Sequence, residues 1–228
     1  MISPLRPILF VVLLAAIALA HAAAPTPPVQ PAHGPGGADY AHARVIAHEM
    51  KSGAQGWWLF VPSSPRPASA PIVVFCHGWG ALDPGGYRAW IDHIVRRGNI
   101  VIWPNYQASL LTPGGDFLPN AIAGIRAALA DLANGTTGIR PELNHVAIVG
   151  HSAGGVLSAQ IAAAAARNGL PVFRAVMPVE PGDGSQDGLW TYSFFNCTGS
   201  MYSFCRRSTQ IACLSASLAS AVRPSAVM

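Results

Sequence analysis

The chain has 228 residues, of which 51% are hydrophobic and only 11% are charged. A chain of this length and composition can bury a sizeable core within one domain, which excludes an intrinsically disordered protein. The net charge of +4 comes mainly from scattered arginines, and Lys51 is the only lysine. Because no basic stripe carries interleaved aromatic residues, the sequence does not indicate a nucleic-acid-binding protein.

Residues 1–22 have the pattern of a secretory signal peptide. Arg6 supplies a positive charge, residues 8–20 are apolar, and Ala20-His21-Ala22 matches a small-x-small cleavage site. The alternative is an uncleaved membrane anchor, but the thirteen apolar residues are fewer than the roughly 20 that a helix needs to span a membrane. We therefore expect a secreted or periplasmic protein with no stable membrane insertion after cleavage.

Three further segments are expected after the signal peptide. Residues 23–40 are interpreted as a flexible linker, because the stretch 25–37 contains five prolines and three glycines. A folded core is expected over residues 41–186, and residues 187–228 form an atypical tail.

The core begins with strands and helices in alternation. Continuous apolar runs predict buried strands, and apolar residues at intervals of three and four predict helices. The expected strands are 56–61, 72–76, 100–103, 146–149 and 172–179. The expected helices are 87–98, 119–134 and 153–168. Alternation of this kind is typical of an α/β fold with a mostly parallel sheet flanked by helices, with 62–71 as a loop after the first strand.

The tail differs in composition from the core. Its last 41 residues contain eight serines and three of the four cysteines, but no acidic residue, histidine or lysine. It is either a divergent closing segment or a stretch read in the wrong frame, and the composition favours the second. The final strands of the sheet are then expected to be missing. The three tail cysteines are spaced eight residues apart, which fits no zinc site, and disulfide pairing stays open.

The most informative motif is Gly150-His151-Ser152-Ala153-Gly154. It has the G-x-S-x-G pattern and stands between the apolar run 146–149 and an alanine-rich helical stretch. A sharp strand-to-helix turn of this kind exposes a serine hydroxyl for nucleophilic attack, and the two glycines remove side chains where strand and helix approach. All eight histidines stand at or before position 151, so none follows Ser152.

These residues resemble the α/β-hydrolase superfamily, and within it the dienelactone-hydrolase-like and cutinase-like polyester esterases. The resemblance covers about residues 56–179 and rests on three segments, which are 72–80 (IVVFCHGWG), 100–104 (IVIWP) and 150–155 (GHSAGG). It implies a serine hydrolase of the carboxylesterase, lipase or cutinase kind. Such an enzyme acts on a small-molecule or polymeric ester through an acyl-serine intermediate, without a cofactor or a metal.

The resemblance also implies roles for individual residues. Ser152 is the expected nucleophile, and the backbone N–H groups of Trp79 and Ala153 are expected to form the oxyanion hole. Glu180 and Asp183 are weak candidates for the acid of the triad. The superfamily supplies its base after the serine, so the base of this chain is unknown and its triad is incomplete.

Histidines before the serine offer surrogate bases, none of them convincing. His77 is expected to hold its loop by hydrogen bonding, and His151, next to the nucleophile, is expected to point away from its hydroxyl. His93 and His145 are interpreted as surface or structural residues. The alternative function is therefore a catalytically silent binding protein with an α/β-hydrolase fold.

Overall fold

The computed structural model describes residues 28–182, of which residues 28–40 belong to one compact unit and 41–182 to another. The predicted signal peptide (1–22), the candidate acid Asp183 and the tail (187–228) lie outside the described residues. The first unit has no helix or strand over residues 28–40. Within it, the Gln30 side-chain amide donates hydrogen bonds to the Gly36 carbonyl and the Tyr40 hydroxyl, at 3.0 and 2.9 Å.

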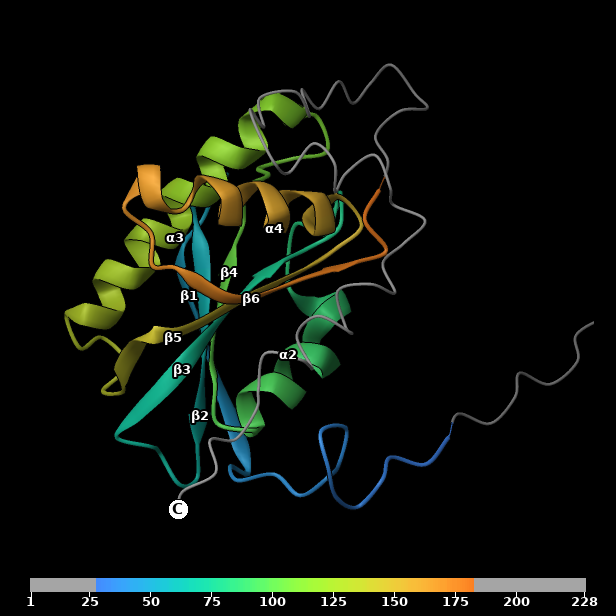
Figure 1. Ribbon diagram of the computed structural model, residues 1–228, viewed down its shortest axis with the longest axis vertical. Coiled ribbons are helices and arrows are strands. Elements are labelled where there is room, and N and C mark those ends of the chain that lie inside the picture. Colours follow the sequence, from blue (N-terminus) through green and yellow to red (C-terminus); the bar gives the residue numbers. More distant parts are fainter. Residues whose placement is uncertain (1–27, 183–228) are drawn as a thin grey trace, which may run out of the picture. The chain divides into compact units, whose positions relative to one another are not determined.

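The second unit is built on a six-stranded sheet with the strand order β1-β2-β4-β3-β5-β6 (Figure 1). The strands are β1 (Arg44–Lys51), β2 (Trp57–Ser63), β3 (Ser69–Cys76), β4 (Ile100–Pro104), β5 (Arg140–His151) and β6 (Phe173–Val179). The helices are α2 (Arg88–Arg96), α3 (Phe117–Ala133) and α4 (Ala153–Ala164), with short 3-10 turns η1 (Gly85–Tyr87), η2 (Gly114–Asp116) and η3 (Ala166–Asn168). β1 and β2 pair antiparallel, as do β2 and β4, and the other three pairings are parallel. The predicted α/β fold is confirmed, with a mixed sheet.

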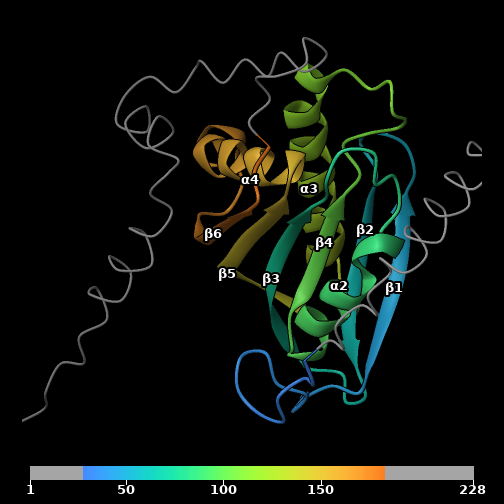
Figure 2. The ribbon, with the colours of Figure 1, turned by 90° about the vertical axis from the view of Figure 1, so that its right-hand side faces the viewer.

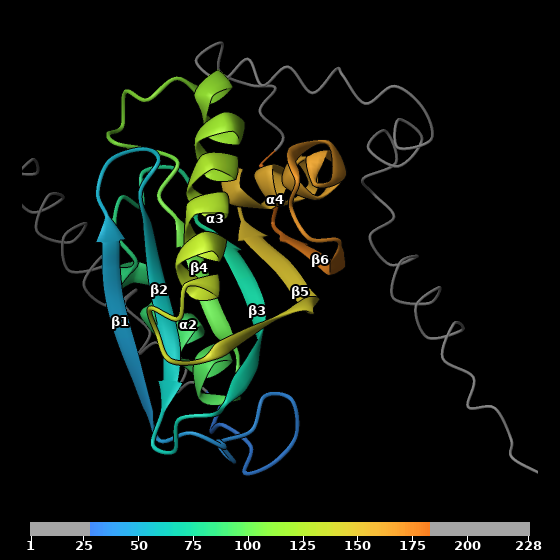
Figure 3. The ribbon, with the colours of Figure 1, turned by 90° about the vertical axis from the view of Figure 1, so that its left-hand side faces the viewer.

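Alternation along the strands divides the core between two faces of the sheet. In β3, the side chains of Ile72, Val74 and Cys76 belong to one buried cluster, and Phe75 belongs to the other. This follows from the two-residue period of a strand, and it explains why the sequence of β3 is apolar throughout. The first cluster is closed by α3 and α4 (Figure 3), and the second by α2 (Figure 2).

The strand boundaries required correction at prolines. The segment 62–71 was predicted to be a loop. In the structure, Pro62 still belongs to β2, where it pairs with Val45 of β1, and β3 already begins at Ser69. β5 likewise starts at Arg140, well before the apolar run. Proline is compatible with a strand where its missing N–H faces away from the ladder or at a strand's beginning, so a proline alone did not mark the end of pairing.

Strand β1 was not predicted at all. Its sequence RVIAHEMK contains no fully buried residue, because among residues 28–182 it lies at the edge of the sheet with β2 on one side. An edge strand with solvent on one side lacks the continuous apolar pattern that marked the central strands.

None of the helices over residues 28–182 is long and apolar enough to cross a membrane.

Candidate active site

Ser152 occupies the turn between β5 and α4 in a backbone conformation that is unusual for a residue with a side chain. Its φ is 53° and its ψ is −120°, outside the regions that L-residues ordinarily adopt. Its N–H donates to the Val179 carbonyl at 3.0 Å, and its own carbonyl accepts from the Gly155 N–H at 2.9 Å. The turn is therefore held from β6 and from the first turn of α4, which keeps a strained residue in place.

Two glycines make this turn sterically possible. A Cβ at Gly150 would lie 1.9 Å from the Gly154 carbonyl oxygen. A Cβ at Gly154 would lie 2.2 Å from the carbonyl oxygens of both Cys76 and His77. Strand β5, helix α4 and the end of β3 thus approach at backbone contact, which only glycine allows at these two positions.

The loop after β3 is anchored by the buried imidazole of His77. Its Nδ1 lies 2.7 Å from the Gly78 carbonyl oxygen and its Nε2 lies 2.7 Å from the Asn105 carbonyl oxygen. The ring stacks on Tyr106 and Trp103, with centroid distances of 4.0 and 4.8 Å. The Tyr106 hydroxyl also donates a hydrogen bond to the His77 carbonyl. His77 is therefore held at its ring, by hydrogen bonds and stacking, and at its backbone carbonyl, by a hydrogen bond. These contacts fix the loop that follows it.

Burial lowers the pKa of His77, although its hydrogen bonds to the two backbone carbonyls act in the opposite direction. A neutral imidazole carries one N–H, so at neutral pH it donates to only one of the two carbonyls at a time.

The anchored loop lies directly against the strand-to-helix turn of residues 150–154, which is called the elbow below. A Cβ at Gly78 would be 3.6 Å from the Ser152 Cβ. Gly80, with a φ of 79°, donates its N–H to the Gln107 side-chain oxygen at 3.1 Å. Trp79 stands between these glycines and the residue is 44% exposed. The segments 77–80 and 150–154, which carry the two sequence motifs, are thus neighbours in space.

The Tyr87 hydroxyl bridges these two segments, a link that sequence reasoning missed. It accepts a hydrogen bond from the Gly78 N–H at 2.9 Å and lies 2.7 Å from His151 Nδ1. In the sequence, Tyr87 is only an aromatic residue at helical spacing. No local signal reveals its hydroxyl, because both partners are distant along the chain.

The candidate acid Glu180 faces His151 rather than the serine. Its side chain is 84% exposed, and its Oε2 lies 3.8 Å from His151 Nε2. Its φ of 43° is a second unusual backbone value next to the elbow. Gly182, two residues later, donates its N–H to the Ser152 carbonyl at 3.2 Å, so the chain passes beside the serine just before Asp183, which lies outside the described residues.

The Ser152 hydroxyl forms no hydrogen bond with any residue between 28 and 182. His151 is engaged with Tyr87 and Glu180, and His77 with backbone carbonyls. His145 lies on the surface, 3.1 Å from Glu142. The described part of the chain thus contains the elbow and the loop beside it, but no histidine bonded to the serine.

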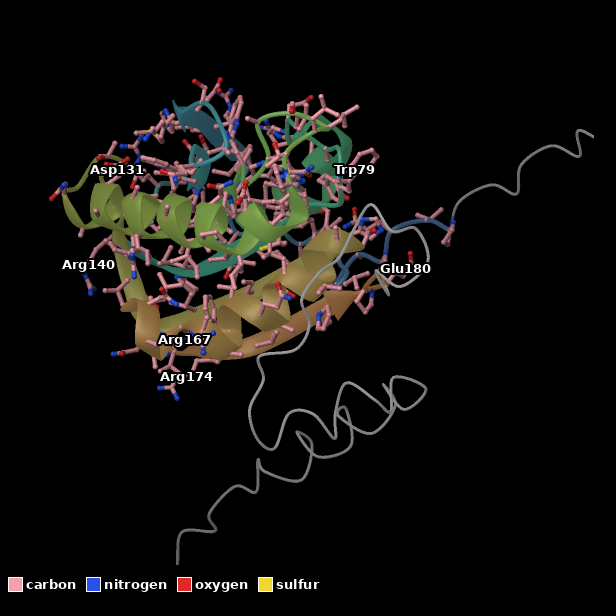
Figure 4. The ribbon with its side chains drawn as sticks, turned by 90° about the horizontal axis from the view of Figure 1, so that it is seen from above. Trp79, Asp131, Arg140, Arg167, Arg174 and Glu180 are labelled. Carbon is pink, nitrogen blue, oxygen red and sulfur yellow. The ribbon has the colours of Figure 1, made fainter. Side chains whose placement is uncertain are left out.

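A second serine, acid and histidine set, Ser69, Glu142 and His145, lies at the amino ends of β3 and β5. The pKa of Glu142 is lowered mainly by the hydrogen bond that the Ser69 hydroxyl donates to it at 2.7 Å. The hydrogen bond with His145 lowers this pKa further. The Ser69 hydroxyl donates to the carboxylate and not to the imidazole, so this arrangement gives the serine no base. Arg140 lies at this same end of the sheet, and Trp79 and Glu180 lie at the opposite end (Figure 4).

The described side chains indicate no metal site. Between residues 28 and 182, no three histidine, cysteine, aspartate or glutamate residues gather closely enough to hold a metal ion. Cys76 is buried, and burial raises the pKa of its thiol, which keeps it protonated and unreactive.

Comparisons with known proteins indicate a family. The sequence model of the chlorophyllase family matches residues 35–193, which is more than half of the chain. No curated protein matches the sequence.

Among solved structures, the chain is similar to an inhibited esterase B from Lactobacillus rhamnosis. The identity is 22% and the TM-score is 0.45, over 60% of this chain and 48% of that one. It is also similar to one of two fungal esterases from Rhizomucor miehei, with 22% identity and a TM-score of 0.49 over 68% of this chain and 49% of that one. An esterase from Pseudomonas putida shows 20% identity and a TM-score of 0.45 over 59% of this chain and 42% of that one. The chain thus spans about half the length of these solved structures.

Proposed function

This chain belongs to the chlorophyllase family of ester hydrolases in the α/β-hydrolase superfamily, and from that premise we propose that it carries the nucleophile of a serine-dependent carboxylic-ester hydrolase. The observation that carries the proposal is the conformation of Ser152. A non-glycine residue at φ 53° between a central strand and a helix is a costly arrangement, and its use is to present the side chain.

In the proposed reaction, the Ser152 Oγ attacks the carbonyl carbon of an ester. The C–O bond to the alcohol then breaks, the alcohol leaves with a proton, and an acyl-serine remains until water hydrolyses it. The substrate is a small-molecule or polymeric carboxylic ester, and the steps require neither a metal nor a cofactor.

Two backbone N–H groups are proposed to stabilise the oxyanion. Ala153 is the first residue of α4, where amides have no acceptor within the helix and the helix dipole is positive. The second donor is the N–H of Trp79, in the loop that lies against the elbow. Removing one such donor from a hydrolase costs about 3 to 4 kcal/mol of transition-state stabilisation.

The proton of the serine hydroxyl is the weak point of the proposed reaction. No described histidine is bonded to Ser152, and no histidine follows it in the sequence. Glu180 and Asp183 remain candidates for the acid, but an acid assists only through a base that it orients. A hydrolase without its base retains about 10³- to 10⁴-fold acceleration over water from binding and the oxyanion hole.

The test compares the full chain with a Ser152→Ala variant, using a short activated ester and a fluorophosphonate probe. We expect feeble turnover and slow labelling of the full chain, both abolished by the substitution. Robust turnover that the substitution abolishes would instead show that one of the upstream histidines acts as base, namely His77, His93, His145 or His151.

The alternative function predicts a different result. If the chain is a catalytically silent binding protein, the probe will label the full chain and the Ser152→Ala variant equally little, and turnover will not differ between them. That outcome would overturn the assignment of Ser152 as nucleophile.

We further propose that the mature protein is exported, on the strength of the signal-peptide pattern of residues 1–22. Mass spectrometry of the native protein should find an N-terminus near Ala23. Recovery of intact residues 1–20 would reject cleavage and favour an anchor.

A further inference from the structure

The hydroxyl of Tyr87 occupies the junction between the loop after β3 and the elbow. The Gly78 N–H can only donate, so the tyrosine oxygen is the acceptor in the 2.9 Å hydrogen bond between them. The O–H of Tyr87 then has one acceptor among the described residues, His151 Nδ1, at 2.7 Å. The hydrogen bonds therefore run in one direction, from the Gly78 N–H through the Tyr87 hydroxyl to the His151 ring.

We propose that Tyr87 is a positioning residue that sets the separation between the loop after β3, which carries Trp79, and the nucleophile Ser152. Its two partners are the residues immediately preceding Trp79 and Ser152, which are the two residues whose relative placement the reaction depends on. This inference rests on the proposed function, because it assigns Tyr87 a part in the geometry of that same site.

The backbone at Gly78 is shaped to admit this hydroxyl. A Cβ at Gly78 would lie 2.8 Å from the Tyr87 oxygen and 3.2 Å from His151 Nδ1. Any side chain at this position would displace the hydroxyl from the amide that it contacts. The absence of a side chain at Gly78 thus leaves room for the Tyr87 hydroxyl. This requirement for glycine is separate from the close contact of strand and helix at Gly150 and Gly154.

The Tyr87 ring is itself packed against the core of the second unit. It packs edge-on against Phe75 with a centroid distance of 5.3 Å, and lies 5.5 Å from Trp103. It stands at the end of η1 and immediately precedes α2. A hydroxyl on a ring fixed by the core holds its partners more firmly than one on a mobile surface side chain, which is what accurate positioning requires.

The same geometry assigns the tautomer of His151. Because Nδ1 accepts a hydrogen bond from the Tyr87 O–H, Nδ1 carries no proton of its own. The proton of the neutral ring is therefore on Nε2, which lies 3.8 Å from Glu180 Oε2. The basic nitrogen of His151 is thus engaged by the Tyr87 hydroxyl. His151 acts with Tyr87 in positioning, and not as the missing base.

The experiment uses the full chain and four variants: Tyr87→Phe, His151→Phe, the double variant, and His151→Asn. Phenylalanine at 87 keeps the packed ring and removes only the hydroxyl. Asparagine at 151 keeps an acceptor near the position of Nδ1. Tyr40→Phe is the matched control, because it likewise removes one tyrosine hydroxyl, which accepts a hydrogen bond from Gln30 and not from the loop after β3. Circular dichroism and thermal melting confirm that each variant is folded.

The first readout is the rate at which a fluorophosphonate probe labels Ser152. We expect Tyr87→Phe to slow labelling about 10- to 100-fold, the range for a misplacement of about 1 Å. His151→Phe should slow labelling by a similar factor. The double variant should be no slower than each single variant, because both substitutions remove the same hydrogen bond between Tyr87 and His151. His151→Asn should recover most of the rate lost in His151→Phe, and Tyr40→Phe should leave the rate unchanged. Equal labelling of the full chain and folded Tyr87→Phe would overturn the proposal.

The second readout is the ¹⁵N NMR spectrum of the His151 ring, which does not depend on reactivity. We expect a protonated Nε2 and an unprotonated Nδ1 in the full chain, and a mixture of tautomers in Tyr87→Phe. A protonated Nδ1 in the full chain, or a spectrum unaffected by Tyr87→Phe, would overturn the link. If the full chain is not labelled at Ser152, the proposed function fails, and this spectrum alone decides whether Tyr87 joins the two segments.

Discussion

The N–H of Ser152 donates a hydrogen bond to the Val179 carbonyl oxygen over 3.0 Å, so the elbow is attached to β6 as well as to β5. β6 is the last strand of the sheet in the described part of the chain, and its outer edge has no neighbour there. The conformation of Ser152 therefore depends on β6, and changes that loosen β6 will also affect the serine.

Replacing Gly154 with alanine should destabilise the protein strongly. An alanine within a helix ordinarily stabilises by about 1 kcal/mol relative to glycine. Here the added Cβ would lie 2.2 Å from two carbonyl oxygens of the neighbouring backbone. We expect the free energy of unfolding to fall by about 3 kcal/mol or more, the upper range for overpacking. Urea unfolding followed by circular dichroism measures it.

Gly86→Ala is the control for this prediction, because apart from Gly86 and its two chain neighbours no heavy atom lies within 4 Å of the Cβ position there. Its free energy of unfolding should stay within about 0.5 kcal/mol of the unmodified chain. A Gly154→Ala variant as stable as Gly86→Ala would mean that the close approach of α4 to β3 is not as described.

Replacing Ser152 with glycine should raise stability while removing the nucleophile. A non-glycine residue at φ 53° carries about 1 to 3 kcal/mol of strain. Glycine relieves the strain but loses about 0.5 to 1 kcal/mol through its greater freedom when unfolded. We expect a net gain of about 1 kcal/mol in the free energy of unfolding. Ser152→Ala keeps the Cβ and should show no such gain, so equal stabilities of the two variants would argue against strain at this position.

Protein stability should decrease below the ordinary pKa of histidine because of His77. Burial lowers its pKa from 6.5 in the folded chain, so the unfolded chain binds a proton that the folded chain does not. The contribution of neutral, buried His77 to the free energy of unfolding is complete above pH 6.5. It is lost progressively as the pH falls below that value. Urea midpoints between pH 5 and pH 8 should fall toward acid in the full chain, and this slope should be reduced in His77→Asn.

His48→Gln, on the exposed edge strand β1, is the control and should keep the slope of the full chain. If stability instead rises toward acid pH, the two carbonyls beside His77 hold a protonated ring, and burial does not dominate its pKa.

Met177→Lys should reduce aggregation. Met177 is 56% exposed on β6, whose unpaired edge in the described structure can template pairing with another chain. A lysine on an edge strand opposes such pairing through its charge. Leu111→Lys, at an 89% exposed loop position, removes an apolar residue away from that edge. Static light scattering should show a larger decrease for Met177→Lys, and equal decreases would point to general surface hydrophobicity.

The buried strands and the elbow could be predicted because their signals are local. The run 146–149, the glycines of the G-x-S-x-G motif and the alanine-rich helix are contiguous in sequence, so sterics and periodicity fixed that part of the structure. The loop that begins at His77 was recognisable for the same reason, since it directly follows a strand buried on both faces.

The rest depended on contacts that a single sequence does not display. β1 is specified by pairing with β2 rather than by its own apolar pattern. The bridge formed by Tyr87 joins residues nine and 64 positions away. Prolines misled the strand boundaries because their effect depends on which side of the ladder they face, which only the pairing reveals.

The stack of His77 on Trp103 also provides the molecule with an optical reporter. A protonated imidazole quenches the fluorescence of an indole that it contacts, because the excited indole transfers an electron to the cation. Because the ring centroids are 4.8 Å apart and Trp103 is fully buried, we expect the emission of this tryptophan to respond to the charge on His77 and not to solvent. The pH-dependent part of the emission that disappears in a Trp103→Phe variant therefore reports, without any added label, the protonation of the histidine that anchors the loop beside Ser152.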